Sequence, residues 1–388
     1  MAGQDSETDI ETHIIHQRDC FTVLEELPAN SVHAIVTDPP YAEGDYDGMM
    51  GEEWDSFDGP KEFQEWCHKW AEQCKRVLKP GGHLIAFGSN DGHHRMFCGV
   101  EDAGFEIRDT LTWHYSDAMP KGQDISKLID RREGKTDERE VIGERTTTYD
   151  GADRDPEKHS NPADDSNIGE WGFNETPHGA KQRQGATERS RQWDGWRTGL
   201  KNASEFAVLA RTPLSEGTAV DNVLEHETGG LHVNGCRITP DGWIPHAERE
   251  LGEGRYPMNT VFSHEEAQRL DERNNDSLST YFYCPKASPS ERTVNDLVPE
   301  EYVHPTQKPE ELMKWLVTLV TRENHIVLDP FAGSGTTCVA SKELGRQFIG
   351  IEKDETYADI ARLRSGLALD DPTRFNDDDQ SSISEFTD

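Results

Sequence analysis

Long apolar runs are missing from this chain of 388 residues, in which only 33% of the residues are hydrophobic. A membrane-spanning helix needs about 18 consecutive apolar residues, and no such stretch occurs. The amino end also lacks the basic and apolar regions of a secretory signal. We therefore expect a cytoplasmic protein with no membrane partner, in which long polar insertions interrupt the packed core.

Cysteine is scarce and is not spaced for metal binding. The seven cysteines form no C-x-x-C pair, and their number is odd. Neither a zinc site nor a set of disulfides is indicated. No metal is therefore expected.

Lysine is also scarce, at 15 of the 40 basic residues, which face 75 acidic residues and leave a net charge of −35. Such a surface repels nucleic-acid phosphates at long range. At roughly 1 M salt the Debye length falls to about 3 Å, which screens this repulsion. The composition resembles that of proteins from halophilic archaea or their viruses. A mesophilic acidic protein with a localised basic patch is the alternative.

One basic patch occurs between positions 181 and 201, where six basic residues face two acidic ones and two tryptophans lie among them. Cationic side chains with interleaved aromatic rings suit contact with a nucleic-acid backbone and stacking on bases. A solvated loop whose tryptophans pack on the body is the alternative. The candidate DNA-binding residues are Lys181, Arg183, Arg189, Arg191, Trp193, Trp196 and Arg197.

The apolar run 32–37 ends in Asp38-Pro39-Pro40-Tyr41. This sequence predicts a strand whose carboxyl end presents a carboxylate, two rigid prolines and an aromatic ring. Open α/β sheets bind their ligands at that edge. A strand stopped by a Pro-Pro turn is the alternative for this motif alone.

A second motif lies near the carboxyl end, where an apolar strand at 326–328 runs into the sequence DPFAGSGTT at 329–337. The glycines let the backbone approach a ligand closely. The turn lacks the lysine of a P-loop and the third glycine of the dinucleotide fingerprint, so a phosphate cradle is not indicated. The next strand, 347–351, ends on Glu352, an acid placed to bind ribose hydroxyls. These features favour a nucleoside ligand without a pyrophosphate.

The two motifs together resemble the amino-group DNA methyltransferases, which use S-adenosylmethionine (SAM) and carry D/N/S-P-P-Y/F/W and F-x-G-x-G motifs. The catalytic motif comes first here, which is the permuted order of that family's β group. Further stretches resemble the same family, namely Asp19-Cys20 after a first strand, YCPKAS at 283–288 and HPTQKP at 304–309. The resemblance covers residues 12–130 and 204–365, and it adds Lys286 to the candidate DNA-binding residues.

The resemblance implies a doubly wound, mostly parallel Rossmann-like α/β sheet assembled from both chain ends, in which the strand before Asp19 lies beside the strand before Glu352. We predict helices at 62–78, 95–101, 310–320, 338–344 and 356–367, and strands at 13–16, 83–87, 105–113 and 205–210. The predicted regions are an acidic disordered amino end (1–11), a catalytic half (12–113), a polar insertion for target recognition (114–203), a sheet strand (204–212), an irregular recognition or support region (213–280), a SAM-binding half (281–367) and an acidic disordered tail (368–388).

The same resemblance implies the chemistry of the first motif. An exocyclic amine is a poor nucleophile because its lone pair is delocalised into the ring. Hydrogen bonds from the amine to the Asp38 carboxylate and the Pro39 carbonyl oxygen would localise the lone pair. Pro40 would fix the turn, and Tyr41 would stack on a flipped base. Cys284 precedes a proline instead of following one, so the covalent route of cytosine-C5 enzymes is disfavoured.

On the cofactor side, the resemblance implies that Phe331, Gly333 and Gly335 pack on SAM. Glu352 would bind the ribose and Asp19 would meet the adenine. Thr306 and Lys308 would lie near the methionine part, although a loop followed by a helix start is the alternative. The candidate SAM-binding residues are Asp19, Cys20, Thr306, Lys308, Asp329, Pro330, Phe331, Gly333, Gly335, Thr336 and Glu352.

The expected function is site-specific methylation of adenine N6 in double-stranded DNA, because Asp at the first motif position goes mostly with adenine in this family. Cytosine-N4 methylation is the alternative, since either amine offers the same two hydrogens. A non-catalytic SAM- and DNA-binding regulator and an RNA or protein amine methyltransferase are further alternatives. A cognate restriction endonuclease and a homodimer stay open as partners. We expect the irregular middle third to read the target sequence.

Overall fold

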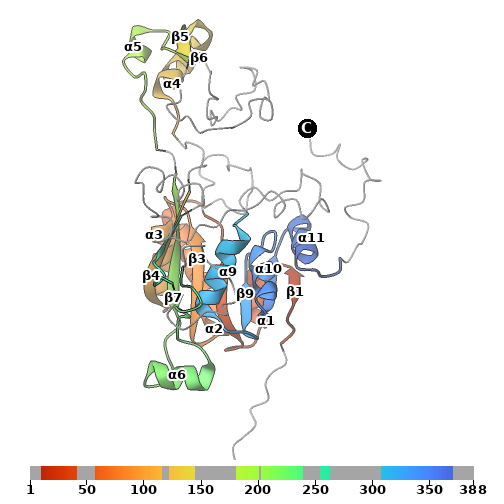
Figure 1. The fold of residues 1–388 in the computed structure, drawn as a ribbon. Coiled ribbons are helices and arrows are strands. Elements are labelled where there is room, and N and C mark those ends of the chain that lie inside the picture. The colour runs from red at the N-terminus through yellow and green to blue at the C-terminus, as the bar shows by residue number, and fades with distance from the viewer. Residues whose placement is uncertain are drawn as a thin grey trace, which may run out of the picture. The chain divides into compact units, whose positions relative to one another are not determined.

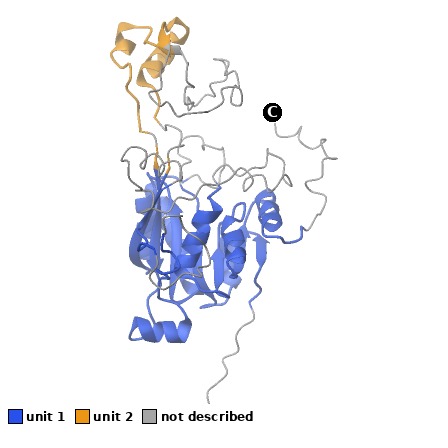
Figure 2. Ribbon diagram, viewed as in Figure 1, with its two compact units in different colours: residues 1–114, 204–388 blue, residues 115–203 orange. Residues whose placement is uncertain are grey.

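The computed structural model describes residues 10–41, 57–115, 122–144, 181–200, 202–238, 254–262 and 307–369. The chain forms two compact units, shown in blue and orange in Figure 2. Unit 1 comprises Met1–His114 and Ser204–Asp388, and unit 2 comprises Tyr115–Ala203. No helix within the described ranges is long and apolar enough to cross a membrane.

Unit 1 is built on an eight-stranded sheet (Figure 1). Neighbouring strands run parallel, except that one strand, β7, is antiparallel to both of its neighbours. The predicted mostly parallel α/β sheet is therefore confirmed. In sheet order the strands are β1 (Ile14–Gln17), β10 (Gln347–Glu352), β9 (Ile326–Asp329), β2 (Val32–Thr37), β3 (Leu78–Gly88), β7 (Ser204–Arg211), β4 (Glu106–His114) and β8 (Thr260–Phe262).

The two ends of the chain meet in this sheet. Strands β1 and β10 pair in parallel, with Gln17 opposite Glu352. The strand before Asp19 thus lies beside the strand before Glu352, as the sequence predicts. A single sheet is therefore completed by segments from opposite ends of the sequence.

Helices cover both faces of the sheet (Figure 1). The central strands β2 and β9 are buried at every position, because layers on both sides exclude water. Alternate residues point to opposite layers: Ile35 packs in one apolar cluster, and Ala34 and Val36 pack in the other. The first layer contains α1 (Cys20–Glu26), α2 (Pro60–Val77) and α3 (His93–Asp102), and the second contains α9 (Glu310–Val320) and α10 (Thr336–Glu343). The last helix, α11 (Glu355–Arg364), packs against β1.

The edge of the sheet at which β2 and β9 begin holds two buried histidines. The rings of His33 and His325 stack with centroids 4.1 Å apart, and each Nδ1 accepts a backbone N–H bond. Together with Glu227 they have the spacing of a metal site. Lys79 Nζ lies 2.8 Å from His33 Nε2, however, and an ammonium there opposes a second cation. The contacts favour two neutral stacked rings.

Unit 2 contains short elements joined by polar contacts. They are α4 (Ile125–Arg132), the 3₁₀ helix η2 (Thr136–Glu138), β5 (Val141–Glu144), β6 (Lys181–Arg183) and α5 (Glu188–Arg191). Strands β5 and β6 form an antiparallel pair. No helix is predicted from sequence for α4 or α5, nor for α6 (Ala219–His226) of unit 1. Helix α5 has only four residues and no apolar side chain, and the buried face of α4 is formed by the polar residues Ser126 and Asp130.

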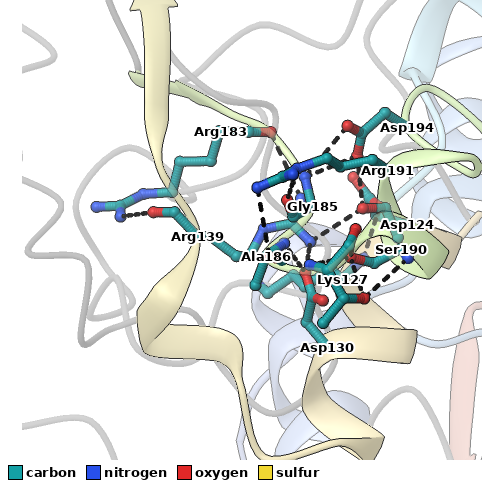
Figure 3. A network of polar contacts seen from close by, with 12 residues as sticks. Asp124, Lys127, Asp130, Arg139, Arg183, Gly185, Ala186, Ser190, Arg191 and Asp194 are labelled. Carbon is teal, nitrogen blue, oxygen red and sulfur yellow. Dashed lines mark hydrogen bonds and ion pairs between the residues drawn. The ribbon is translucent and has the colours of Figure 1, made fainter.

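The centre of unit 2 is a network of hydrogen bonds around two carboxylates (Figure 3). Asp130 is fully buried, and its Oδ2 accepts from Arg139 Nη1 at 2.7 Å and from the Ala186 amide at 3.0 Å. Burial alone would raise the pKa of Asp130, but these donors outweigh it and lower the pKa. Asp194 accepts from Ser126 Oγ at 2.5 Å and from the Gly185 amide. The described part of unit 2 is thus organised by charge-assisted hydrogen bonds.

Candidate active site

Five acidic residues gather at one edge of the sheet in unit 1. Asp19, Asp38 and Asp329 stand at or just after the carboxyl ends of β1, β2 and β9. Glu352 ends β10. Glu205 joins them from the start of β7, because an antiparallel strand begins at the edge where its parallel neighbours end. Glu205 is not predicted from the sequence. The signal that could have revealed it is an acidic residue at the start of the strand where the chain returns to the sheet.

Asp38 is the centre of a hydrogen-bonded cluster. Its Oδ1 accepts from the Tyr41 hydroxyl at 2.5 Å, and its Oδ2 accepts from Lys308 Nζ at 2.5 Å. Lys308 also donates to Tyr41 Oη and pairs with Glu205 Oε2, each at 3.0 Å. The cluster therefore joins two carboxylates, one phenol and one ammonium from three separate segments of the chain.

Burial and the two carboxylates together set the charge states in this cluster. Burial by itself lowers the pKa of Lys308, but the Asp38 and Glu205 carboxylates outweigh it and raise the pKa above its usual value. The ammonium therefore stays charged. Burial, together with the same two carboxylates, raises the pKa of Tyr41 well above its usual value, so the hydroxyl stays a donor. Lys308 Nζ also lies 5.1 Å from the ring centroid of Phe87.

Two carboxylates hold the turn that follows β9. Asp329 Oδ1 accepts from Thr37 Oγ1 at 2.6 Å and from the Phe331 amide at 3.1 Å, and burial raises the pKa of Asp329 to about 6. Glu352 Oε2 accepts from the Gly333 amide at 2.8 Å, and burial raises its pKa as well. The turn is thus fixed by its own strand and by the neighbouring strand.

The glycines of this turn have a structural reason to be glycine. Gly335 has a φ of +82°, and a Cβ built on it would lie 2.8 Å from the Cβ of Ala361 in α11. Gly333 has a φ of +51°. Thr336 begins α10, and its hydroxyl oxygen accepts a hydrogen bond from Arg364 Nη1 at 3.1 Å. Pro330, at the start of the turn, is buried. Close packing of α11 therefore requires the glycine at 335.

An aromatic group borders the turn. The half-buried ring of Phe331 lies 5.6 Å from the ring of Trp66 and 5.8 Å from that of Trp70, both from α2. Trp70 is fully buried. Trp66 is half-buried and faces the turn, which the spacing alone does not reveal.

The segment after β1 reaches the same edge. Asp19 accepts from the Phe21 amide at 3.0 Å and so caps α1. Cys20 is buried, which raises the pKa of its thiol to about 12. The Arg18 amide donates to the carbonyl of Glu352 at 3.0 Å. The predicted residues Asp19, Cys20 and Glu352 are therefore brought together by the pairing of β1 and β10.

Comparison with known proteins identifies the family. The model of the N6/N4 DNA methylase family matches residues 32–363. The chain belongs to this family of DNA methylases.

The type II methyltransferase M.HindIII of Haemophilus influenzae is 26% identical over 386 residues, which cover 91% of this chain and 95% of M.HindIII. The type II methyltransferase M.HinfI of the same species is 22% identical over 356 residues, covering 89% of this chain and 66% of M.HinfI. Among solved structures, the PvuII DNA methyltransferase (cytosine-N4-specific) is 14% identical, with a TM-score of 0.47 and coverage of 93% and 88%.

Methylases of this family take the methyl group from SAM, so SAM is the cofactor of this enzyme. The residues at the edge of the sheet fit such a ligand. Phe331 offers a half-exposed ring, Glu352 offers carboxylate oxygens, and the turn at Gly333 and Gly335 carries no side chain there. Bases and hydroxyls of a nucleoside need these kinds of partner.

The predicted DNA-binding arginines of this methylase differ in their hydrogen-bond and ion-pair partners. Arg183, Arg191 and Arg197 each donate to a backbone carbonyl of unit 2, at 3.2, 2.9 and 3.0 Å. Arg189 makes one looser ion pair, with Glu133 at 3.8 Å, and its side chain is 78% exposed. Arg189 is therefore the arginine whose charge is most available to a phosphate among these four.

The two predicted tryptophans lie together on the surface of unit 2. Trp193 and Trp196 are 42% and 60% exposed, and their rings meet edge to face with centroids 5.4 Å apart. Neither ring is buried in a core of the described part of unit 2. Lys286, Thr306 and the side chain of Lys181 lie outside the described residues.

Proposed function

We propose that this methylase is a site-specific enzyme that transfers a methyl group from SAM to the exocyclic N6 of adenine in double-stranded DNA. The observation that carries the proposal is the Asp38 cluster, in which a carboxylate and the Tyr41 ring share the end of a buried strand. By resemblance, family members with Asp at this position act mostly on adenine. Cytosine N4 is the alternative acceptor, because its amine offers the same two hydrogens.

In the proposed reaction the amine of a flipped base donates to the Asp38 carboxylate and the Pro39 carbonyl oxygen. These bonds draw the nitrogen lone pair out of the ring and aim it at the methyl group. Bound SAM would supply that methyl group on a positively charged sulfur, whose bond to the methyl carbon would break as the N–C bond forms, and the extra amine proton would leave through the Asp38 carboxylate to solvent. Pro40 fixes the turn, and the Tyr41 ring stacks on the base, which offsets part of the cost of flipping.

The cofactor side of the proposal rests on the carboxyl ends of β1, β9 and β10. Glu352 binds the ribose, Asp19 faces the adenine, and Phe331 packs on the cofactor. Their common edge and the half-exposed Phe331 ring support these roles. The proposed SAM-binding residues are Asp19, Cys20, Thr306, Lys308, Asp329, Pro330, Phe331, Gly333, Gly335, Thr336 and Glu352.

Target recognition is proposed for unit 2, with support from residues 213–280. The exposed tryptophan pair and the exposed Arg189 support it, since stacking and phosphate contact need accessible groups. Lys181, Arg183, Arg191, Arg197 and Lys286 are the further proposed DNA contacts.

The setting of the enzyme is part of the proposal. The order of the two motifs supports the permuted β group, and the charge of −35 supports a halophilic archaeal or viral origin with a cytoplasmic location. A cognate restriction endonuclease and a homodimer are the proposed further partners. Activity that rises with KCl toward molar concentrations is the expected result for a halophilic enzyme.

The deciding experiment is transfer of labelled methyl groups from SAM to unmethylated double-stranded DNA in molar KCl, followed by digestion and separation of the nucleosides. N6-methyladenine is the expected product. N4-methylcytosine alone would overturn the adenine assignment, and unlabelled DNA would favour a non-catalytic regulator. RNA and protein acceptors in parallel reactions test the remaining classes. Methylation-sensitive sequencing of the same DNA reports the target sequence.

A further inference from the structure

The Lys308 ammonium occupies the acceptors that the proposed reaction needs. Its three N–H groups have three partners, namely Asp38 Oδ2, Tyr41 Oη and Glu205 Oε2, at 2.5, 3.0 and 3.0 Å. The Tyr41 hydroxyl has one proton, which it donates to Asp38 Oδ1 at 2.5 Å rather than to Glu205 Oε2, which lies 3.2 Å away. Both oxygens of Asp38 therefore already accept a hydrogen bond from the chain itself.

A base amine must compete with these two donors. When Tyr41 turns to stack on the base, its hydroxyl leaves Asp38 Oδ1. An amine that binds Asp38 Oδ2 then displaces the Lys308 ammonium. Within the described parts of the chain, Glu205 is the one other acidic residue in ion-pair distance of Lys308 Nζ. Displaced Lys308 is thus left with Glu205 as its anionic partner.

We infer that Glu205 is a positioning residue, which holds the Lys308 ammonium while the target amine occupies Asp38. The inference rests on the proposed function, because it requires a base amine as the competitor. Lys308 is only 5% exposed and lies against the Phe87 ring, so water cannot readily replace a lost partner. A buried ammonium without a counter-charge carries a large desolvation penalty. Glu205 removes that penalty from the step in which the base binds.

The sheet gives Glu205 a fixed place. It is the second residue of β7 and pairs with Trp113 of β4, while the next residue, Phe206, pairs with Gly88 of β3. Strand β7 is therefore hydrogen-bonded on both sides at this point. The Glu205 side chain is 18% exposed. A carboxylate fixed in this way stays beside Lys308 when the Tyr41 segment moves.

The first variant is Glu205→Gln in the full chain, assayed with saturating SAM and unmethylated genomic DNA in molar KCl. Asp38 becomes the sole anionic partner of Lys308, so the base captures Asp38 less often. We expect kcat to fall about 30-fold, the effect of losing one partner of a buried charge pair. The dissociation constants for SAM, measured by calorimetry, and for DNA, measured by filter binding, should stay unchanged.

The second variant is Glu205→Gln with Lys308→Met, which removes the competing cation. Asp38 is then free to accept the amine. Because Lys308 is also a proposed SAM contact, the KM for SAM should rise, whereas kcat at a SAM concentration that saturates this variant should recover about tenfold from the single variant. A purely structural role of Glu205 predicts further loss instead. Glu106→Gln is the matched control, because Glu106 pairs with Arg211 at the other end of β7. Its kcat should equal that of the wild type.

Two results overturn the role of Glu205: an unchanged kcat in Glu205→Gln, or no recovery in the double variant. If Glu205→Gln does not fold, Glu205→Asp, which keeps the charge, is compared with the wild type: its kcat should fall by less than the roughly 30-fold expected for loss of the charge, and a larger fall overturns the role. Wild-type enzyme that labels no DNA would overturn the proposed function itself. The wild-type control thus separates the two failures.

Discussion

The interior of unit 1 and the interior of unit 2 are stabilised by different kinds of interaction. Unit 1 buries apolar clusters on both faces of its sheet, with residues such as Leu24, Trp70 and Trp315 almost or fully inaccessible. In the described part of unit 2, no hydrophobic side chain is buried to that extent, and the inaccessible side chains are those of Ser126, Asp130 and Ser190. Apolar burial is non-directional and tolerates change, whereas a buried polar network depends on every partner.

The largest effect is expected from removing the amine acceptor in unit 1. Asp38→Ala should reduce methyl transfer by at least about 10³-fold, because the Pro39 carbonyl oxygen alone can accept only one of the two amine hydrogens. SAM affinity should stay within about tenfold, since the cofactor side of the edge is untouched. Transfer of labelled methyl groups to DNA measures the activity, and calorimetry measures the affinity for SAM. Surviving activity would show that Asp38 is not the acceptor.

A large but local effect is expected from removing the central carboxylate of unit 2. Asp130→Ala leaves Arg139 buried without its partner, which costs about 3–5 kcal/mol. Unit 2 should become sensitive to proteolysis while unit 1 still binds SAM with its original affinity. Asp137→Ala, which alters an exposed acid of η2, is the control. Joint unfolding of both units would show that Asp130 stabilises more than unit 2.

A moderate effect of pH is expected in unit 1. Burial lowers the pKa of His33 to about 3 and that of His325 to about 4. Because both values lie below that of an unfolded histidine, about 6.5, the unfolded chain binds protons first on acidification and stability is lost below that pH. Between pH 7 and 5 the loss amounts to about 2 kcal/mol for each ring.

Comparison with a double variant isolates this contribution. The pKa of Asp329, which burial raises to about 6, acts in the opposite sense, since the native state then takes up the proton first. His33→Gln with His325→Gln should therefore lose about 4 kcal/mol less stability than the wild type between pH 7 and 5. Urea unfolding at both pH values measures the difference. Identical pH dependence in the two proteins would show that the rings are not kept neutral by burial.

The smallest effect is expected on the surface of unit 2. Arg189→Ala should leave stability unchanged and reduce the slope of log affinity against log salt by about 1, as loss of one phosphate contact does. Arg191→Ala removes the bond to the Gly185 carbonyl and should also destabilise unit 2. DNA binding measured over a range of KCl concentrations, together with thermal unfolding, separates the two. An unchanged slope for Arg189→Ala would place that residue outside the DNA contact.

The sequence predicts the parts of this structure that depend on apolar burial. Runs such as 32–37 and 347–351 mark strands, and the residues after them mark the edge where Asp38 and Glu352 lie. The place of Glu205 could not be predicted, because it depends on β7 being antiparallel, which local sequence does not encode. The contact between Lys308 and Asp38 could not be predicted either, because it joins segments that are distant in the chain. Helix α4 escaped prediction because its buried face contains Ser126 and Asp130.

The pairing of His114 with Ser204 has a consequence for the exchange of unit 2, the proposed recognition unit. The chain leaves unit 1 and returns to it at two residues that already face each other across β4 and β7. A segment of almost any length can be exchanged between them at little entropic cost. The junction nevertheless lies one residue from Glu205, and a shift of one residue in the register of β7 would turn that side chain to the opposite face of the sheet. Exchange of unit 2, in evolution or by engineering, should therefore tolerate many lengths but must preserve the register of β7.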